Sequence, residues 1–316
     1  MPGRSSAGPA DSLKGPSPIQ ASETLSFLSV DAISILAAVT MSTLSILNRH
    51  ALKTGTPYMA AVVVNATVFI LYLALCTALG VSWLDLPSAG VFWFLVAGLS
   101  SPALSMTLYY IALSRFGVGR SAPIAMGSSP LFAVLAAIAI LGERPGWSVY
   151  VGTIFIIAGI WVISRPKGQQ RLKWNEVLIP LGAGFFWGLA GSIRKTALKI
   201  IPDLHVGVVI QAVSALLFLL AIYWLFPPGR RIVRSRQALK FFCLAGTSLA
   251  VAFYFLFTAL MMGEVSRVMA LLGTTPLLTV GLAAVFLRDV EQITLRIYAG
   301  AASIVAGVVL ITLLRG

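Results

Sequence analysis

The chain has 316 residues, of which 58% are hydrophobic and only 10% are charged, and its mean hydropathy is +0.93. A soluble protein carries roughly 25% charged residues, so a water-soluble fold is excluded and lipid is the expected solvent for most of the chain. The net charge of +13 does not indicate nucleic-acid binding, because the basic residues are scattered among short loops between apolar runs. Such residues set orientation and contact anionic head groups, so we expect membrane lipid, and no nucleic acid, as a partner.

Residues 1–28 are rich in Ser, Pro, Ala and Gly and lack an apolar run, which predicts a flexible tail and not a signal peptide. Ten apolar segments follow, and each approaches the roughly 20 residues that a helix needs to cross the hydrocarbon. Helices are expected because the segments show no polar–apolar alternation, and because backbone groups in lipid must pair internally. The expected spans are 30–50, 58–79, 90–112, 119–141, 147–164, 175–196, 205–226, 240–261, 266–287 and 294–313.

A five-residue phrase occurs twice in the chain, 146 positions apart. Gly127-Ser128-Ser129-Pro130-Leu131 lies near the middle of the fourth span, and Gly273-Thr274-Thr275-Pro276-Leu277 lies near the middle of the ninth. Because each copy has an odd number of spans, the second copy enters the membrane from the opposite side. The predicted fold is therefore all-α and integral to the membrane, with ten transmembrane helices arranged as two inverted five-helix repeats. The expected domains are the flexible tail 1–28, the first repeat 29–165, a basic linker 166–174 and the second repeat 175–316.

Secondary transporters built from inverted repeats hold their substrate at the repeat interface, near the bilayer midplane. We therefore expect a central polar cavity lined by spans one, three, four, six, eight and nine. Pro130 and Pro276 each remove a helical hydrogen bond, which predicts two kinked helices that line this path, with a packing kink as the alternative. The predicted substrate-facing hydroxyls are those of Ser128, Ser129, Thr274 and Thr275.

Other polar and aromatic side chains within the spans are candidates for the same cavity. An amide facing lipid would leave donors and an acceptor unpaired, so Asn65 and Gln211 are expected to point into the bundle. Each amide meets either the substrate or a polar group of a neighbouring helix, and the sequence does not distinguish between these two alternatives. The remaining predicted substrate-binding residues are Asn48, Tyr109, Trp187 and Tyr254.

Charged residues near span ends admit two interpretations. Arg194 and Lys195 lie near the end of the sixth span, where snorkelling to the interface is the favoured interpretation and binding of an anionic substrate is the alternative. Glu143 and Asp289 close the fourth and ninth spans as either gate carboxylates or end-capping groups. The two histidines stand alone near span ends, so no metal site and no cofactor are expected.

The order of small, apolar and acidic residues in each half resembles an EamA-type domain of the drug/metabolite transporter superfamily. In the first half the resemblance is carried by Ala112-Leu113, Ala122-Pro123, Pro130-Leu131, Leu141-Gly142-Glu143-Arg144, Gly152 and Ala158-Gly159-Ile160. In the second half it is carried by Ala259-Leu260, Pro276-Leu277, Leu287-Arg288-Asp289, Gly300 and Ala306-Gly307-Val308. The resemblance implies ten helices, alternating access, and export or exchange of small metabolites. Asp289 stands where that family carries Glu, which keeps a carboxylate at the helix end.

The acidic residues lie in the tail, in loops or near span ends, and none lies at mid-bilayer. Facilitated diffusion or exchange is therefore expected in preference to proton antiport, which would use a buried acid. The predicted function is a secondary transporter of a small metabolite or drug-like solute, present as a monomer or homodimer in the plasma (inner) membrane. The alternative is an integral membrane enzyme that acts on a lipid-linked substrate. A flux assay separates the two, because a transporter moves an unmodified solute and an enzyme yields a product.

Overall fold

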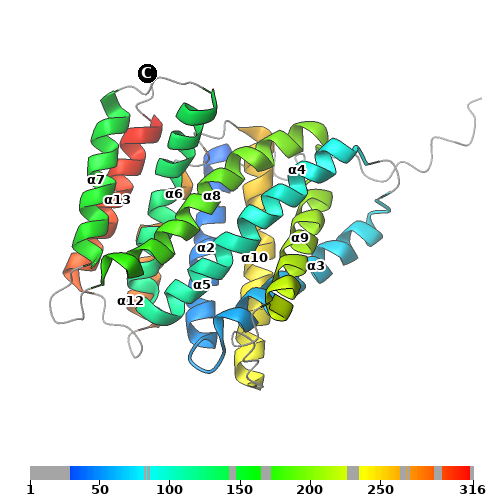
Figure 1. The fold of residues 1–316 in the computed structure, drawn as a ribbon, viewed down its shortest axis with the longest axis horizontal. Helices are drawn as coiled ribbons and strands as arrows, with labels where there is room; N and C mark the ends of the chain where they lie inside the picture. Colours follow the sequence, from blue (N-terminus) through cyan, green and yellow to red (C-terminus); the bar gives the residue numbers. More distant parts are fainter. Residues whose placement is uncertain are drawn as a thin grey trace, which may run out of the picture.

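The computed structural model describes residues 29–81, 83, 86–141, 147–164, 172–225, 235–263, 268, 271–287 and 294–313, and its regular elements in these ranges are helices (Figure 1). The first repeat consists of α2 (Val30–Ala51), α3 (Pro57–Ala78), α4 (Ser88–Gly98), η2 (Leu99–Leu104), α5 (Ser105–Phe116), α6 (Val118–Leu141) and α7 (Trp147–Ser164). The second repeat consists of α8 (Trp174–Ile200), α9 (Leu204–Leu225), α10 (Arg236–Met262), α12 (Thr275–Phe286) and α13 (Leu295–Leu313).

Length and composition make six helical segments of the described ranges suitable for crossing a membrane, and three further apolar helices are shorter. The third span is formed by α4, η2 and α5 together, and it counts as one of the six. The all-helical, two-repeat architecture expected from the sequence is confirmed, and the protein is an integral, multi-pass membrane protein.

Local signals in the sequence set where several helices begin. The Ser29 hydroxyl accepts a hydrogen bond from the backbone N–H of Ala32 at 3.2 Å, and thereby caps α2. The Thr56 hydroxyl caps α3 in the same way, with Pro57 as the first helical residue. At the other end of the third span, Gly117 adopts φ 80°, a conformation that lets α5 stop and α6 begin at once.

Two spans are broken within the bundle. In the third span, Ser101 has extended backbone angles (φ −155°, ψ 119°) and is followed by Pro102, so η2 separates α4 from α5. In the ninth span, a turn at Gly273 and Thr274 precedes α12, which starts with Thr275 and has Pro276 in its first turn. Pro130, the counterpart of Pro276, lies instead inside the continuous helix α6. The two prolines of the repeated phrase therefore occupy different helical positions.

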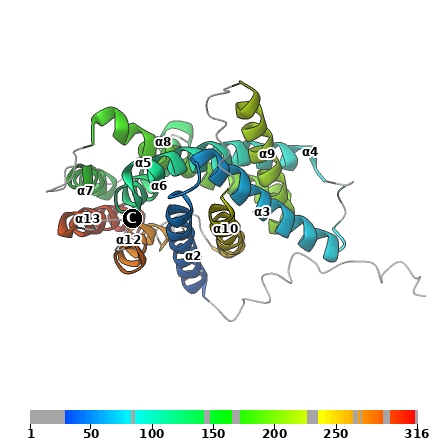
Figure 2. The ribbon, with the colours of Figure 1, turned by 90° about the horizontal axis from the view of Figure 1, so that it is seen from below.

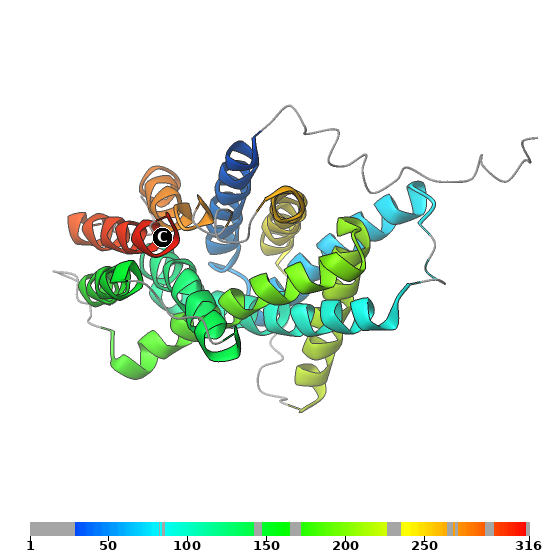
Figure 3. The same ribbon diagram turned by 90° about the horizontal axis from the view of Figure 1, so that it is seen from above.

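Helix packing follows the approximate two-fold relation between the repeats. Helix α3 packs on its counterpart α9, and α7 packs on its counterpart α13. Helix α2 packs on α10 and α12, just as α8 packs on α5 and α6. The pair α7–α13 lies at one end of the molecule and α3, α4 and α9 lie at the other, with α2 and α10 between them (Figures 1 and 2). Seen from above, α8 runs alongside the third span (Figure 3).

Glycines allow the closest of these helix contacts. A Cβ added to Gly159 of α7 would lie 2.5 Å from the carbonyl oxygen of Gly300 in α13. A Cβ added to Gly188 of α8 would lie 2.5 Å from the carbonyl oxygen of Ser129 in α6. Lipid tails are as apolar as the side chains, so such contacts hold the helices together through close packing.

Candidate functional site

A cavity lies where the two repeats meet. It contains about 660 Å³ of space not filled by protein atoms, a figure that includes the part open to the outside. It is bounded by α2, α5 and α6 of the first repeat and by α8, α10 and Leu272–Thr275 of the ninth span in the second. These are the six spans that the sequence analysis expected around the central cavity. The lining residues are Met41, Met106, Met126, Ser129, Pro130, Trp187, Gly191, Arg194, Phe253, Leu256, Leu260, Leu272, Gly273 and Thr275.

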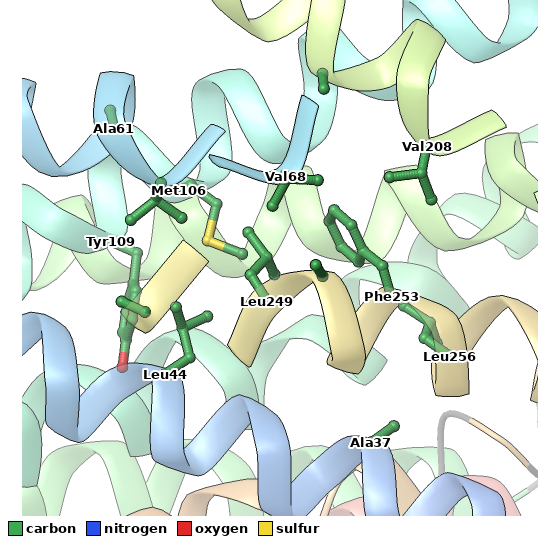
Figure 4. Close-up of a cluster of buried hydrophobic side chains, with 14 of the residues drawn as sticks. Ala37, Leu44, Ala61, Val68, Met106, Tyr109, Val208, Leu249, Phe253 and Leu256 are labelled. Atoms are coloured by element: carbon green, nitrogen blue, oxygen red, sulfur yellow. The ribbon is translucent and has the colours of Figure 1, made fainter. Parts of the chain in front are cut away.

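The lining residues of α8 and of α10 follow helical spacing, so each helix presents one face to the cavity. On α8, Trp187, Gly191 and Arg194 are four and three residues apart, so they share one face. On α10, Phe253, Leu256 and Leu260 share a face in the same way. Figure 4 shows Phe253 and Leu256 on α10, together with Met106 from the third span, within the buried apolar cluster.

The lining is mostly apolar, which corrects the expectation of a polar cavity. The reason lies in how the hydroxyls of the repeated phrase are used. Thr275 Oγ1 donates to the carbonyl oxygen of Leu272 at 2.5 Å, and Thr274 Oγ1 donates to that of Leu271 at 2.7 Å. Ser128 Oγ donates to the carbonyl oxygen of Ala125 at 3.2 Å. These hydroxyls therefore satisfy backbone groups of their own segments.

Of the predicted substrate-binding residues, Ser129, Trp187 and Thr275 line the cavity, as does the predicted kink residue Pro130. Tyr109 is fully buried directly behind this lining, with its ring centroid 5.3 Å from that of Trp187. Its hydroxyl donates to Ser45 Oγ at 2.8 Å. Tyr109 of α5 thus contacts Trp187 with its ring and α2 with its hydroxyl.

The predicted amides lie inside the bundle but outside the cavity lining. Asn48 and Asn65 are fully buried, and each donates to a carbonyl of its own helix, at 3.0 and 2.8 Å respectively. Gln211 is also fully buried, and its Oε1 accepts a hydrogen bond from Arg194 Nε at 2.8 Å. Gln211 therefore acts as an interhelical polar contact between α9 and α8.

Tyr254 belongs to a different cluster, away from the cavity lining. Its ring centroid lies 6.4 Å from that of His205, which in turn lies 6.1 Å from the ring of Tyr72. His205 Nδ1 is 3.3 Å from Asp203 Oδ1, at the turn between α8 and α9. Burial acts to raise the pKa of Asp203, but hydrogen bonds from the His205 side chain and from backbone N–H groups outweigh burial, and the pKa lies below its ordinary value.

Arg194 lines the cavity although the sequence analysis did not place it among the binding residues. Snorkelling was the favoured interpretation, and it is wrong for this residue, because the side chain is only 4% exposed. Its neighbour Lys195 donates to the carbonyl oxygens of Leu260 and Gly263, where α10 ends. The sequence does contain a sign of this position at the cavity. At the repeat offset of 146, Arg194 corresponds to Asn48, which is among the predicted substrate-binding residues.

The predicted gate or end-capping carboxylates, Glu143 and Asp289, lie outside the described residues. Pro276 is buried in the first turn of α12 beside the lining residue Thr275. Among the described residues, no cluster of three or more His, Cys, Asp or Glu side chains could hold a metal ion.

Each proline of the repeated phrase deprives one carbonyl of its helical N–H partner, and at Leu272 the Thr275 hydroxyl takes that place. A proline in a helix leaves the carbonyl four residues earlier without its usual partner. For Pro130 and Pro276 those residues are Met126 and Leu272, which both line the cavity. We expect the double substitution Pro130→Ala with Pro276→Ala to reduce transport far more than membrane insertion, because it supplies a backbone N–H to each carbonyl and removes the ring that bends the helix. Solute flux and the amount of inserted protein are the measurements, and Pro123→Ala, elsewhere in α6, is the control; unchanged flux in the double variant would identify the prolines as packing devices only.

Comparisons with known proteins agree with this architecture. A family model described as the EamA-like transporter family matches residues 28–165 and 174–313. The curated protein "Uncharacterized transporter YwfM" of Bacillus subtilis (strain 168) is 28% identical over 184 residues, which are 57% of this chain and 60% of that relative. A crystal structure of a protein that is 21% identical aligns with a TM-score of 0.66 over 91% of this chain and 97% of the other, a likeness that shows the fold. Since the family model covers both repeats and most of the chain, this protein belongs to the EamA-like transporter family.

Proposed function

We propose that the protein is a secondary transporter that moves a small metabolite or drug-like solute across the plasma (inner) membrane by alternating access, in export or exchange. The observation that carries the proposal is the cavity at the repeat interface, to which α2, α5 and α6 contribute from one repeat and α8, α10 and Leu272–Thr275 from the other. Rocking of one repeat against the other would open such a cavity to each side in turn.

Exchange or facilitated diffusion fits the cavity better than proton antiport. The lining residues include one basic residue, Arg194, and no acidic residue. A proton-coupled carrier would take up its proton on a buried acid within the membrane. We therefore propose that the solute gradient itself, or a counter-solute, drives transport.

A flux experiment tests the proposal. The purified chain is reconstituted into vesicles, and a panel of labelled metabolites and drug-like solutes is supplied on one side, with and without unlabelled solute on the other. The expected result is saturable movement of at least one unmodified solute, which empty vesicles do not show and which counter-solute accelerates. A chemically altered product without net movement of the solute would favour an enzyme that acts on a lipid-linked substrate.

A further inference from the structure

The Arg194 guanidinium is a buried charge within a membrane-spanning helix. The side chain is 4% exposed and lies six residues before the end of α8 at Ile200. Taking a charge out of water is costly unless a counter-charge and hydrogen bonds compensate it, and charged residues within membrane helices are functional in most cases. The partners of Arg194 therefore decide what this side chain does.

The partners that the structure gives Arg194 are all neutral. Nε donates to Gln211 Oε1 at 2.8 Å, and Nη2 donates to the carbonyl oxygen of Ser101 at 2.6 Å. The rings of Phe253 and Phe257 lie 5.4 and 5.9 Å from Cζ, close enough for cation–π attraction. These contacts fix the position of the guanidinium, but two hydrogen bonds use only part of its five N–H donors.

No carboxylate within the described ranges balances this charge. Asp203, at the turn between α8 and α9, pairs instead with His205, whose Nδ1 is 3.3 Å from its Oδ1. The cavity beside Arg194 therefore carries a net positive charge from its lining residues.

A second positive feature lies at the same cavity. The turn at Gly273 and Thr274 breaks the ninth span, so α12 starts at Thr275, and Gly273 and Thr275 both line the cavity. The first turn of a helix carries a partial positive charge, and broken helices in transporters direct such ends at anionic groups of the substrate. The remaining walls are formed mainly by thioether, aromatic and aliphatic side chains, of which the most prominent are Met41, Met106, Met126, Trp187 and Phe253.

We propose that the transported solute is an organic monoanion, a carboxylate with an apolar body, whose charged group binds Arg194 and whose body lies among the methionine and aromatic side chains. This inference rests on the proposed transport function and specifies its substrate class. The planar guanidinium matches a carboxylate in shape, with paired N–H donors facing two oxygens. The flexible thioethers of the three methionines adapt to differently shaped apolar bodies.

Other solute classes match the cavity less well. A dianion such as a phosphomonoester would bring two negative charges to a single guanidinium. A cation or a zwitterion would bring an ammonium group to a lining that offers no acidic residue. Neutral solutes would leave the Arg194 charge without a counter-charge in the membrane interior.

Binding of three probes with the same apolar body and different head groups tests the proposal. We would titrate the purified full-length chain with 3-phenylpropionate, 3-phenylpropionamide and 3-phenylpropylamine, using calorimetry and ligand-induced thermal stabilisation. The expected result is a preference for the carboxylate of at least about tenfold over the amide and the amine, the size of effect that a charge-assisted hydrogen bond gives. Equal affinity for the three probes, preference for the amide or amine, or no binding of the carboxylate would overturn the proposal.

Two variants separate substrate binding from a structural role of the same arginine. Arg194→Met is expected to lose the preference for the carboxylate, whereas Arg194→Lys keeps the charge and a weakened preference. An arginine that only ties α8 to the third span would lower thermal stability in both variants and leave the ratio of affinities unchanged, which would overturn the proposal. If Arg194→Met does not fold, the three-probe comparison with the unmodified chain and with Arg194→Lys still decides.

Different experimental outcomes would overturn the transport proposal and the proposal that the solute is an organic anion. Saturable flux of neutral or cationic solutes in the reconstituted vesicles, without flux of carboxylates, would overturn the anion proposal alone. Carboxylate binding that depends on Arg194, without flux of any solute in either direction, would overturn transport alone.

Discussion

Gly191→Trp is expected to abolish transport while the protein still inserts and folds. Gly191 lies on the cavity face of α8, between Trp187 and Arg194, and an indole at this position would occupy the space between them. A solute that must pass through this cavity could then neither enter it nor be carried across by rocking of the two repeats. We expect flux at the level of empty vesicles, measured for any solute that the unmodified chain moves.

The neighbouring residue supplies a matched control for that experiment. Ser192 follows Gly191 on the same helix, but it is exposed on the surface of the protein and does not line the cavity. Ser192→Trp adds the same indole group at nearly the same depth, so its flux is expected to stay close to that of the unmodified chain. Equal flux in the two variants would show that solute does not pass through this cavity.

Gly159→Leu is expected to destabilise the contact between α7 and α13, at the end of the molecule farthest from α3 and α9 (Figure 2). A Cβ at position 159 would lie 2.5 Å from the carbonyl oxygen of Gly300 and 3.1 Å from the backbone nitrogen of Ile304. Backbone atoms cannot rotate away as side chains do, so the helices must separate. Overpacking of this kind costs about 1–3 kcal/mol, and occasionally more. Thermal unfolding in detergent is the measurement.

Ala158→Leu is the control for the helix contact. Ala158 is the preceding residue of α7, it is exposed, and the substitution adds a leucine of the same size where lipid can accommodate it. Its midpoint of unfolding is expected to stay within a degree or two of the unmodified chain, because surface substitutions away from contacts have small effects. A similar loss of stability in both variants would mean that leucine at this depth is unfavourable for reasons other than the contact with Gly300.

The fold could be predicted closely because membrane spans have a strong sequence signal. Apolar runs of the required length are rare outside lipid, and the 146-residue offset between copies identified the two repeats. The expected spans end within four residues of the observed helices, apart from the ninth. The ninth span is interrupted at Gly273 and Thr274, close to Pro276, where the sequence predicted a kink; what the sequence did not show is that the kink ends one helix and begins another.

The interior faces of the spans were harder to predict than the spans themselves. A soluble helix shows its buried face through polar residues on the opposite side, whereas a helix in lipid is apolar all round. Tyr254 was selected for this reason, although the adjacent Phe253, about 100° away around α10, faces the cavity. Amides such as Asn65 were correctly expected to be inside, but being inside the bundle did not distinguish the cavity from the packed core.

The burial of Arg194 was not predicted, because the expected sixth span ends before the observed helix does. The expected span ended at residue 196, which put the arginine at the interface, but α8 continues to Ile200. Each residue adds about 1.5 Å, so four further residues place Arg194 about 6 Å farther from the end of the helix than expected. The pairing with Gln211 depends on α9 lying against that stretch, which a single sequence does not reveal.

The two broken spans are not equivalent, since the counterpart of the third span is the continuous α10 and the counterpart of the ninth is the continuous α6. In a duplicated carrier, exchanging the conformations of the two halves converts one end state into the other. In this protein the exchange would require each half to break a span that is broken only in the other half. The two end states therefore differ in free energy. If the protein works by alternating access, as proposed, the empty carrier would therefore populate one end state more than the other. Such a bias would set which side of the membrane the empty cavity faces more often, and it would supply no energy for accumulation of the solute.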